Sequence, residues 1–393
     1  MLTNFARFYI KKNMTKRKFI TSCLLTIVLL GSCDKKRESV NLNDCISGDE
    51  KFTLIKDEAN KVSFSLDSVT TPNISYLKYT TLGDSLYFSF LNPFNNSIYL
   101  YDYSSRNLAK TISLTSDKKI SAYEIISKNL IAAYQKKTYD LTLQDDKGSI
   151  KKTINIPPQK GSNGYYSYPT THASLIHRQG KLYLVGGHLS NVKVQENSHC
   201  VAEINIDSEE FKYLYQYPEI YQKYFFGGSH YRMDISYDYN SNEDVFVVSF
   251  PASHKLYKTA DFITDTEFCA SSSLTDMIDQ YPYDNQDKTF DYVSENLYYH
   301  SIKYDPYNNV YYRLCLLPLA DKESEVYSRD LSVVILDQNL NKIGEKVLKN
   351  FSDYYLGNIA SIHVSPDGLL FQKKNYKKDE SSINFTIYKL AKL

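Results

Sequence analysis

The sequence predicts an all-β fold, a six-bladed β-propeller built from four-stranded antiparallel blades. Three observations support this prediction. From residue 52 onwards, apolar and aromatic residues alternate with polar residues in short stretches, which is typical of half-buried strands. These stretches group in fours. Turn residues recur at the same places within the groups, which favours a propeller over a sandwich.

The strands of each blade can be placed by this alternation. Those of the first three blades are expected at Ile74–Leu82, Ser85–Phe90, Ser97–Tyr103 and Ala109–Leu114; Ser121–Ile126, Leu130–Tyr134, Thr138–Leu143 and Ile150–Ile156; and His172–Arg178, Lys181–Val185, Cys200–Ile206 and Phe211–Tyr217. Those of the last three are expected at Met233–Tyr239, Val245–Phe250, Lys255–Phe262 and Glu267–Ala270; Tyr299–Tyr304, Val310–Leu316, Leu331–Leu336 and Lys342–Leu348; and Ile359–Val364, Leu369–Lys373 and Ile383–Leu390.

The last blade therefore lacks one strand, and Lys61–Leu66 is an isolated strand before the first blade. An N-terminal strand that completes the last blade closes the ring and removes exposed sheet edges. We expect this closure. A seventh blade within residues 271–300 remains an alternative, and Leu274–Gln280 is the best candidate for a short helix.

The first 33 residues have the pattern of a bacterial lipoprotein signal. Six basic residues and no acidic one precede the short, mostly apolar stretch Phe19–Leu30, and Cys33 follows the small residues Gly31 and Ser32. This order defines a secretory signal, and the apolar stretch is too short to span a membrane. Leu-Gly-Ser-Cys resembles the lipobox, so residues 1–32 are expected to be removed and Cys33 to be lipidated. A cleaved signal without lipid and an N-terminal anchor helix are the alternatives.

Residues 33–51 are expected to form a polar tether and residues 52–393 a single propeller domain. The chain has 46 basic and 45 acidic residues, and the net charge becomes −5 without residues 1–32. Nucleic acid is therefore not an expected partner, whereas the membrane is, through the lipid. The residues after Cys33 include no acidic cluster of the kind that marks surface export. We therefore expect a cell-envelope protein on the outer membrane that faces the periplasm.

Four cysteines remain beyond the anchor: Cys45, Cys200, Cys269 and Cys315. Their spacing matches no zinc-binding pattern. Cys200 and Cys315 fall in strand-like stretches and are expected to be buried free thiols. One disulfide bond is compatible with an oxidising envelope.

The lipobox, the isolated strand and a final blade that contains Val364–Phe371 (Val-Ser-Pro-Asp-Gly-Leu-Leu-Phe) resemble Bacteroidetes lipoprotein propellers. The chain is most similar to domain-of-unknown-function family 4221, and more broadly to six-bladed TolB-like propellers. The resemblance implies a propeller fold over nearly all of the mature chain. It transfers no activity and no catalytic residue.

No motif of a serine hydrolase, a zinc protease or a phosphate-binding loop is present, so no catalytic residue, metal or cofactor is predicted. His172, His300 and His363 fall on first strands, which line the centre of a propeller. Three histidines can bind a transition metal, but these come from different blades at different offsets, which favours structural histidines. The acidic run Asp238–Asp244 has Glu243 where a calcium loop needs Gly, so a hairpin turn is expected.

Tyrosine is the unusual feature of the composition, with 37 Tyr and 19 Phe but no Trp. Tyrosine clusters precede the third, fourth and fifth blades, in connections that meet on one face of a propeller. A tyrosine rim there would suit a glycan or a peptide, whereas packing between blades in place of Trp is the alternative. The candidate ligand-binding residues are Tyr166, Tyr168, His172, His230, Tyr231, Arg232, Tyr299 and His300.

The expected function is a lipid-anchored scaffold that binds an envelope protein or a glycan or peptide ligand. The alternative is a carbohydrate-active hydrolase or lyase with its site at the channel mouth. Convergence of His172, Arg232, His300 and a carboxylate would favour the enzyme. A structural subunit of an envelope complex is a third hypothesis.

Overall fold

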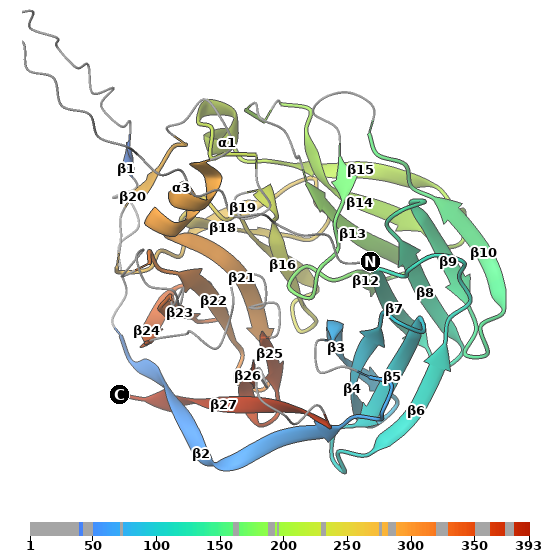
Figure 1. The fold of residues 1–393 in the computed structure, drawn as a ribbon. Coiled ribbons are helices and arrows are strands. Elements are labelled where there is room, and N and C mark those ends of the chain that lie inside the picture. Colours follow the sequence, from blue (N-terminus) through green and yellow to red (C-terminus); the bar gives the residue numbers. More distant parts are fainter. Residues whose placement is uncertain are drawn as a thin grey trace, which may run out of the picture. The chain divides into compact units, whose positions relative to one another are not determined.

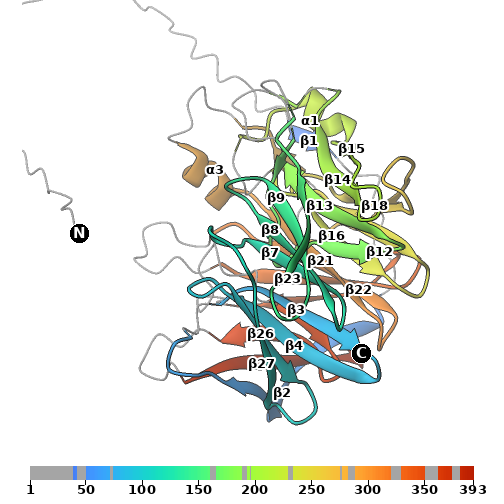
Figure 2. The ribbon, with the colours of Figure 1, turned by 90° about the vertical axis from the view of Figure 1, so that its right-hand side faces the viewer.

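The computed structural model describes residues 39–41, 50–70, 74–159, 165–187, 193–194, 196–228, 233–274, 277–281, 288–319, 329–349, 362–373 and 381–393. Within these residues the chain is all-β, a propeller-like arrangement of small antiparallel sheets (Figure 1). Successive sheets stand next to one another around a common centre (Figures 1 and 2). The expected all-β, propeller-like architecture is therefore confirmed.

The first two sheets each have four strands in chain order. The first contains β3 (Ser75–Leu82), β4 (Ser85–Asn92), β5 (Ser97–Asp102) and β6 (Leu108–Ser113). The second contains β7 (Ala122–Ser127), β8 (Leu130–Gln135), β9 (Asp140–Gln144) and β10 (Ile150–Asn155). The predicted strands agree with these to within about two residues, because the alternation and the turn residues are both local signals.

The third and fourth sheets repeat this order. The third contains β12 (Ile176–Arg178), β13 (Lys181–Gly187), β14 (His199–Asn205) and β15 (Phe211–Gln216), and the short β11 (Tyr166–Ser167) also pairs with β13. The fourth contains β16 (Ser236–Asn240), β17 (Val245–Ser249), β18 (Lys255–Thr259) and β19 (Thr266–Cys269).

An eight-stranded sheet contains two four-stranded antiparallel halves. One half contains β21 (Tyr298–Asp305), β22 (Val310–Leu316), β23 (Leu331–Leu336) and β24 (Lys342–Leu348). The other contains β25 (Ile362–Ser365), β26 (Gly368–Lys373), β27 (Ser382–Lys392) and β2 (Phe52–Ser65). The halves meet at one parallel pair, Phe52 with Gly344.

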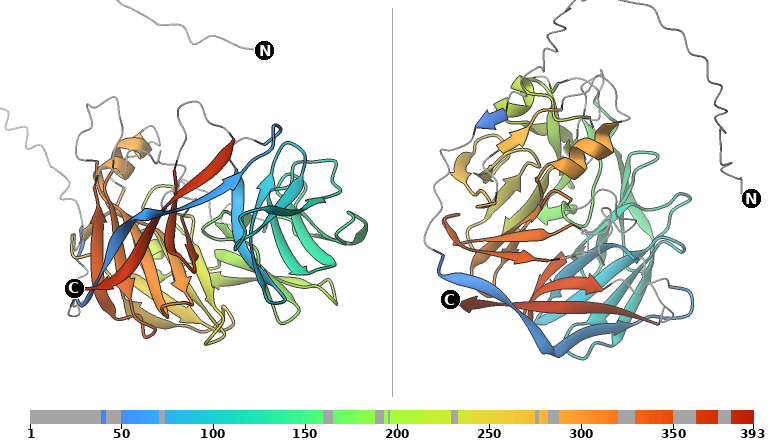
Figure 3. Two further views of the ribbon diagram at one scale, coloured as in Figure 1. Left: turned by 90° about the horizontal axis from the view of Figure 1, so that it is seen from below. Right: turned by 60° about the vertical axis from the view of Figure 1, so that its left-hand side comes forward.

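The N-terminal strand β2 pairs with β27 along most of its length, from Phe52–Lys392 to Ser65–Ser382 (Figure 3). The predicted closure of the last strand group is thus observed, with a longer strand than expected. Gly344 permits the approach of β2 to β24, because a Cβ at this position would overlap the Phe52 carbonyl oxygen.

The described residues include two short helices, α1 (Glu219–Lys223) and α3 (Thr289–Glu295). The predicted helix at Leu274–Gln280 is wrong, because β20 (Met277–Asp279) lies there and pairs with β1 (Ser39–Asn41). Pairing with a strand distant in sequence overrides the weak local helical pattern. Neither described helix is long and apolar enough to cross a membrane.

Tyrosines fill the spaces between sheets and bond to the neighbouring sheet. Tyr123 of β7 donates to Ser89 Oγ of the first sheet over 2.7 Å. Tyr237 of β16 donates to the Ser174 carbonyl, which precedes β12, over 2.7 Å. Tyr101 of β5 donates to the Ser65 carbonyl of β2 over 2.6 Å, and Tyr101, Tyr123 and Tyr237 are all buried. Each supplies a large apolar ring and a satisfied hydroxyl, which is the packing alternative considered for the missing Trp.

Two charged side chains link neighbouring sheets. Arg313 on β22 bonds to the fourth sheet, and Glu345 on β24 bonds to the segment that follows the fourth sheet. Arg313 is fully buried and donates to Ser249 Oγ and to the carbonyls of Ser253, His254, Lys255 and Ala270 over 2.6–3.2 Å. Glu345 accepts bonds from Ser272, Ser273, Ser332 and Lys342. Burial raises the pKa of Glu345, but these donors lower it to about 2.

The cysteines agree with the sequence analysis where they are described. Cys200 and Cys315 are free and buried, as predicted. Cys269, at the end of β19, is disulfide-bonded.

Candidate functional site

Charged and imidazole side chains from different sheets meet where the first strands of neighbouring sheets contact one another. We call this group the central cluster. It contains Lys78, Glu124, His172, Asp238, His300, Lys303 and His363. Inner strands β3, β7, β16, β21 and β25 carry six of these residues, and His172 lies in the segment before β12.

Lys78 joins the first three sheets at this centre. Its ammonium group is hydrogen-bonded to the carboxylate of Glu124 and donates to the Leu175 carbonyl over 2.7 Å. Burial lowers the pKa of Lys78 to about 7, although the Asp238 carboxylate acts in the opposite direction. Burial and the hydrogen-bonded Glu124 carboxylate therefore act in opposite directions on the charged form of Lys78.

The charge of Lys303 influences the pKa of several other residues of the central cluster. Its ammonium group donates to the Thr171 carbonyl over 3.3 Å, and burial lowers its pKa while Asp238 raises it. Asp238 accepts the backbone N–H groups of Tyr304 (2.8 Å) and Tyr239 (3.0 Å). Burial raises the pKa of Asp238, and Lys303 is the largest influence in the other direction.

The three histidines all lie within range of the charge of Lys303. The rings of His172 and His300 lie 4.7 Å apart, and His363 packs 5.8 Å from the ring of Tyr79. Burial, followed by the charge of Lys303, lowers the pKa of His300 and of His363 to about 3, and burial also lowers that of His172. The three rings are therefore neutral at pH 7. His172 Nδ1 and His363 Nε2 have no hydrogen-bond partner among the described residues.

The arrangement of the histidines does not form a metal site. No group of three or more His, Cys, Asp or Glu among the described residues is placed to hold a metal ion. His300 Nδ1 instead contacts Ser301 Oγ over 3.2 Å. Nor does the described part of the cluster place a carboxylate within hydrogen-bonding distance of His172 or His300, and Arg232, the other member of the convergence that would favour an enzyme, lies outside the described residues.

Tyr166 and Tyr168 both lie close to the ammonium group of Lys136. The Lys136 ammonium is 5.0 Å from the ring centre of Tyr166 and 3.7 Å from that of Tyr168. Both tyrosines and Lys136 are partly exposed. Burial lowers the pKa of Lys136, and Asp234 acts against this. Tyr166 and Tyr168 are accessible to a ligand, but the Lys136 ammonium group already makes cation–π contacts with both rings.

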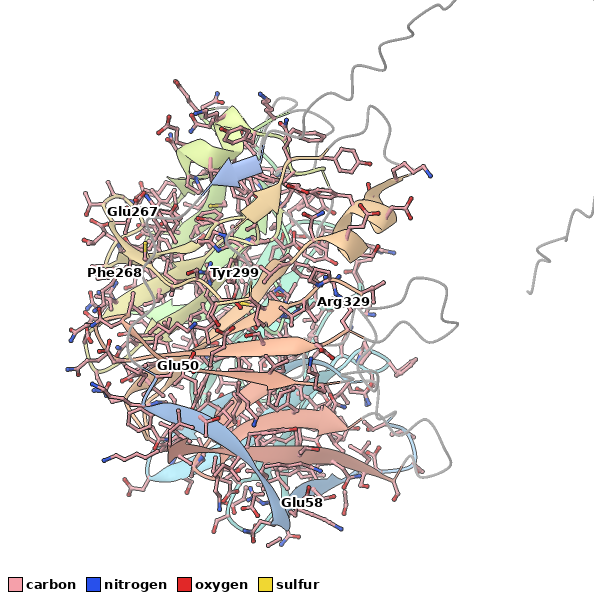
Figure 4. All side chains as sticks on the ribbon, turned by 90° about the vertical axis from the view of Figure 1, so that its left-hand side faces the viewer. Glu50, Glu58, Glu267, Phe268, Tyr299 and Arg329 are labelled. Carbon is pink, nitrogen blue, oxygen red and sulfur yellow. The ribbon has the colours of Figure 1, made fainter. Side chains whose placement is uncertain are left out.

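Tyr299 is not part of an exposed rim, and that expectation is wrong. Its side chain is 1% exposed, and the residue lies among the strands in Figure 4. The hydroxyl is hydrogen-bonded to His254 Nδ1 (2.5 Å), and the Arg313 guanidinium lies 3.5 Å from the ring centre. The tyrosines that precede the fourth and fifth blades in the sequence are likewise mostly buried, as Tyr217, Tyr221 and Tyr298 are.

Of the predicted site residues, the structure brings His172 and His300 together at the centre and places Tyr166 and Tyr168 elsewhere. Cys33, His230, Tyr231 and Arg232 lie outside the described residues. Sequence reasoning missed Lys78, Glu124, Asp238 and Lys303. Their signal was present, because each is a charged residue within the first strand of a predicted blade.

The comparisons with known proteins agree with this architecture. Residues 51–347 match the family described as Domain of unknown function (DUF4221). The chain belongs to this family. A crystal structure of a DUF4221 member from Bacteroides vulgatus is similar with a TM-score of 0.72 and 21% identity, over 88% of this chain and all of that one.

A second similar structure is that of a Bacteroides fragilis protein predicted to be exported. Its TM-score to the chain described here is 0.50 at 11% identity, and the match covers 88% of the present chain and 97% of the Bacteroides fragilis protein. At these identities the likeness shows the fold alone. No curated protein matches the chain.

Proposed function

We propose that this DUF4221 member is a lipid-anchored, six-bladed propeller of the bacterial envelope that binds an anionic ligand at its central cluster. The six groups of four strands support the blade count. The lipobox at Cys33 and the similarity to an exported protein support the envelope, with the outer membrane as the site of the anchor. The disulfide-bonded Cys269 also fits an oxidising compartment.

The observation that carries the proposal is that the charge of Lys303 acts on three buried histidines of the central cluster, His172, His300 and His363. Burial disfavours the charged form of Lys303, so a bound anion would stabilise that form. His172 Nδ1 and His363 Nε2 are buried nitrogens without a described partner, which is an unfavourable state unless something hydrogen-bonds to them. A carboxylate, phosphate or sulfate group would supply acceptors for all of these donors. An acidic glycan and an acidic peptide both carry such groups.

Thermal unfolding with added anions tests this proposal. Acetate, citrate, phosphate, sulfate and glucuronate are compared with neutral sugars at constant ionic strength. A ligand at about 100 times its Kd stabilises the folded state by about 2.7 kcal/mol. At least one anion is expected to raise the Tm, and Lys303→Met is expected to abolish the increase. Lys110→Met, which changes an exposed ion pair with Asp146, is the matched control and should keep it.

The result that would overturn the proposal is the absence of any anion-specific increase, or an increase that Lys303→Met retains. A Lys303→Met protein that does not fold is replaced by Lys303→Gln, which keeps a polar side chain. The anchor is tested separately. Cys33→Ala should release the protein from membranes, and unchanged membrane retention would refute lipidation.

A carbohydrate-active hydrolase or lyase is the second candidate, and Lys78 is the observation that favours it. A lysine with a pKa of about 7 beside a carboxylate is suited to act as a general base. Turnover on a glycan panel that Lys78→Met abolishes would favour the enzyme. Binding without turnover would favour the scaffold.

A further inference from the structure

A groove of about 500 Å³ lies between β15 and the β18–β19 hairpin, on the outer part of the third and fourth sheets. Its floor is aromatic. Phe250 packs 6.1 Å from Tyr215, 5.6 Å from Tyr217 and 5.5 Å from Tyr257, measured between ring centres. These floor rings are all at least nine-tenths buried. We call this feature the tyrosine groove. It is separate from the central cluster and from every predicted site residue.

The rim of the tyrosine groove is acidic. Glu219 at the start of α1, Asp265 in the β18–β19 turn and Glu267 on β19 contribute exposed carboxylates. Glu267 forms an ion pair with Lys255 and lies at the edge of the molecule in Figure 4. No described cation lies within ion-pair distance of Glu219 or Asp265. Burial lowers the pKa of His199, the imidazole of this groove, so it does not neutralise them at pH 7.

Tyr215 gives a second and independent indication of a ligand. The side chain is 7% exposed and lines the groove, and its buried hydroxyl makes no hydrogen bond of normal geometry with a described residue, although it lies close to the Asp265 carboxylate. Burial and the nearby Asp265 carboxylate raise its pKa, so the hydroxyl stays neutral. A buried hydroxyl without a partner costs about 1–3 kcal/mol, which an incoming donor would recover.

The backbone conformation beside the groove bears on whether a peptide could bind there as an added strand. Tyr215 has a φ of 58° and Phe262, on the opposite wall, also has a φ of 58°. A left-handed residue interrupts the regular row of N–H and C=O groups on the outer edge of β15, so that edge is a poor template for an added strand. The groove therefore suits recognition of a side chain rather than strand addition.

We propose that the tyrosine groove binds an arginine side chain of a basic peptide segment. The planar guanidinium would lie on the aromatic floor, pair with Asp265 and Glu219, and donate to the Tyr215 hydroxyl. The same combination occurs within this protein. The Arg106 guanidinium lies 3.7 Å from the ring centre of Tyr103 and 2.7 Å from Asp367.

Fluorescence anisotropy of a fluorescein-labelled peptide of alternating Gly and Arg tests the proposal. The comparison peptide has citrulline in place of Arg, which keeps the planar shape and removes the charge. The Arg peptide should bind at least about tenfold more tightly, a difference of about 1.4 kcal/mol. Its binding should weaken as salt is added, because the rim carboxylates are exposed.

Three variants locate the binding. The double variant Glu219→Gln with Asp265→Asn should weaken the Arg peptide at least about tenfold. Tyr215→Phe removes only the hydroxyl, so it should weaken binding of the Arg peptide to a smaller extent and should raise, not lower, the Tm of the free protein. Asp84→Asn, at an exposed turn of the first sheet, is the matched control and should change nothing.

Equal binding of the citrulline peptide, or full binding by the double variant, would overturn the proposal. Binding of a neutral oligosaccharide with no binding of the Arg peptide would overturn it too, because the groove would then be a sugar site. The result is independent of the central cluster, since Lys303→Met should leave binding of the Arg peptide intact.

Discussion

Replacement of Arg313 by Met is predicted to destabilise the fold strongly. Arg313 sits on β22, is 0% exposed, and donates five hydrogen bonds to the chain between Ser249 and Ala270. The Tyr299 ring covers its guanidinium at 3.5 Å. Backbone carbonyls and an aromatic face, rather than a carboxylate, provide the described environment of this charge.

The magnitude follows from the groups that lose a donor. His254 O keeps a bond from the Ala270 N–H, so the carbonyls of Ser253, Lys255 and Ala270 are the main groups affected. At about 1 kcal/mol for each lost bond, and with relief of the buried charge partly offset by the loss of the Tyr299 contact, the expected loss is about 3 kcal/mol. Arg313→Lys keeps the charge but loses the planar fork, so it should be destabilised as well.

Urea unfolding followed by circular dichroism measures these differences, since the chain has no Trp to report by fluorescence. Arg106→Met is the matched control. Its side chain is 28% exposed and pairs with the exposed Asp367, so the loss should not exceed about 1 kcal/mol. Wild-type stability of Arg313→Met would refute the reasoning, and wild-type stability of Arg313→Lys would show that charge without the fork suffices.

Two further predictions concern the eight-stranded sheet. Glu345 has its pKa lowered to about 2, so its contribution is fully present above its ordinary value of 4.5 and is lost as pH falls from there to about 2. The loss should be about 3 kcal/mol, and Glu345→Gln should flatten that part of a plot of unfolding free energy against pH. Gly344→Val should separate β2 from β24, since the added Cβ overlaps the Phe52 carbonyl. Hydrogen exchange should then speed up at the start of β2, and unchanged protection there would contradict this account.

The strands were predictable because their signals are local. Alternation with period two and turns such as Ser365-Pro366-Asp367-Gly368 depend only on neighbouring residues. The pairing of β2 with β27 is long-range, yet it followed from a counting argument, since the last group lacked one strand and an isolated strand was available. No strand was missing from a predicted blade to indicate the pairing of β20 with β1, and Leu274–Gln280 was therefore assigned wrongly to a helix.

The site was less predictable because it depends on which sheets meet. Asp238 was placed correctly in a first strand, but the strand pattern does not reveal that its carboxylate comes under the charge of Lys303 from another sheet. Tyr299 shows the reverse case. Its cluster of tyrosines suggests an exposed surface, whereas packing against Arg313 and His254 buries it. Residue type alone does not separate a buried tyrosine from a binding one.

The central claim is that an anion binds among the three histidines around Lys303. Histidine ring resonances, followed by NMR during titration with the anion that raises the Tm, test it most directly. Signals of His172, His300 and His363 should shift together with one Kd, while that of His199, in the tyrosine groove, should not. Lys303→Met should abolish the shifts. Shifts confined to histidines outside the central cluster, or no shifts at ligand concentrations that raise the Tm, would contradict the claim.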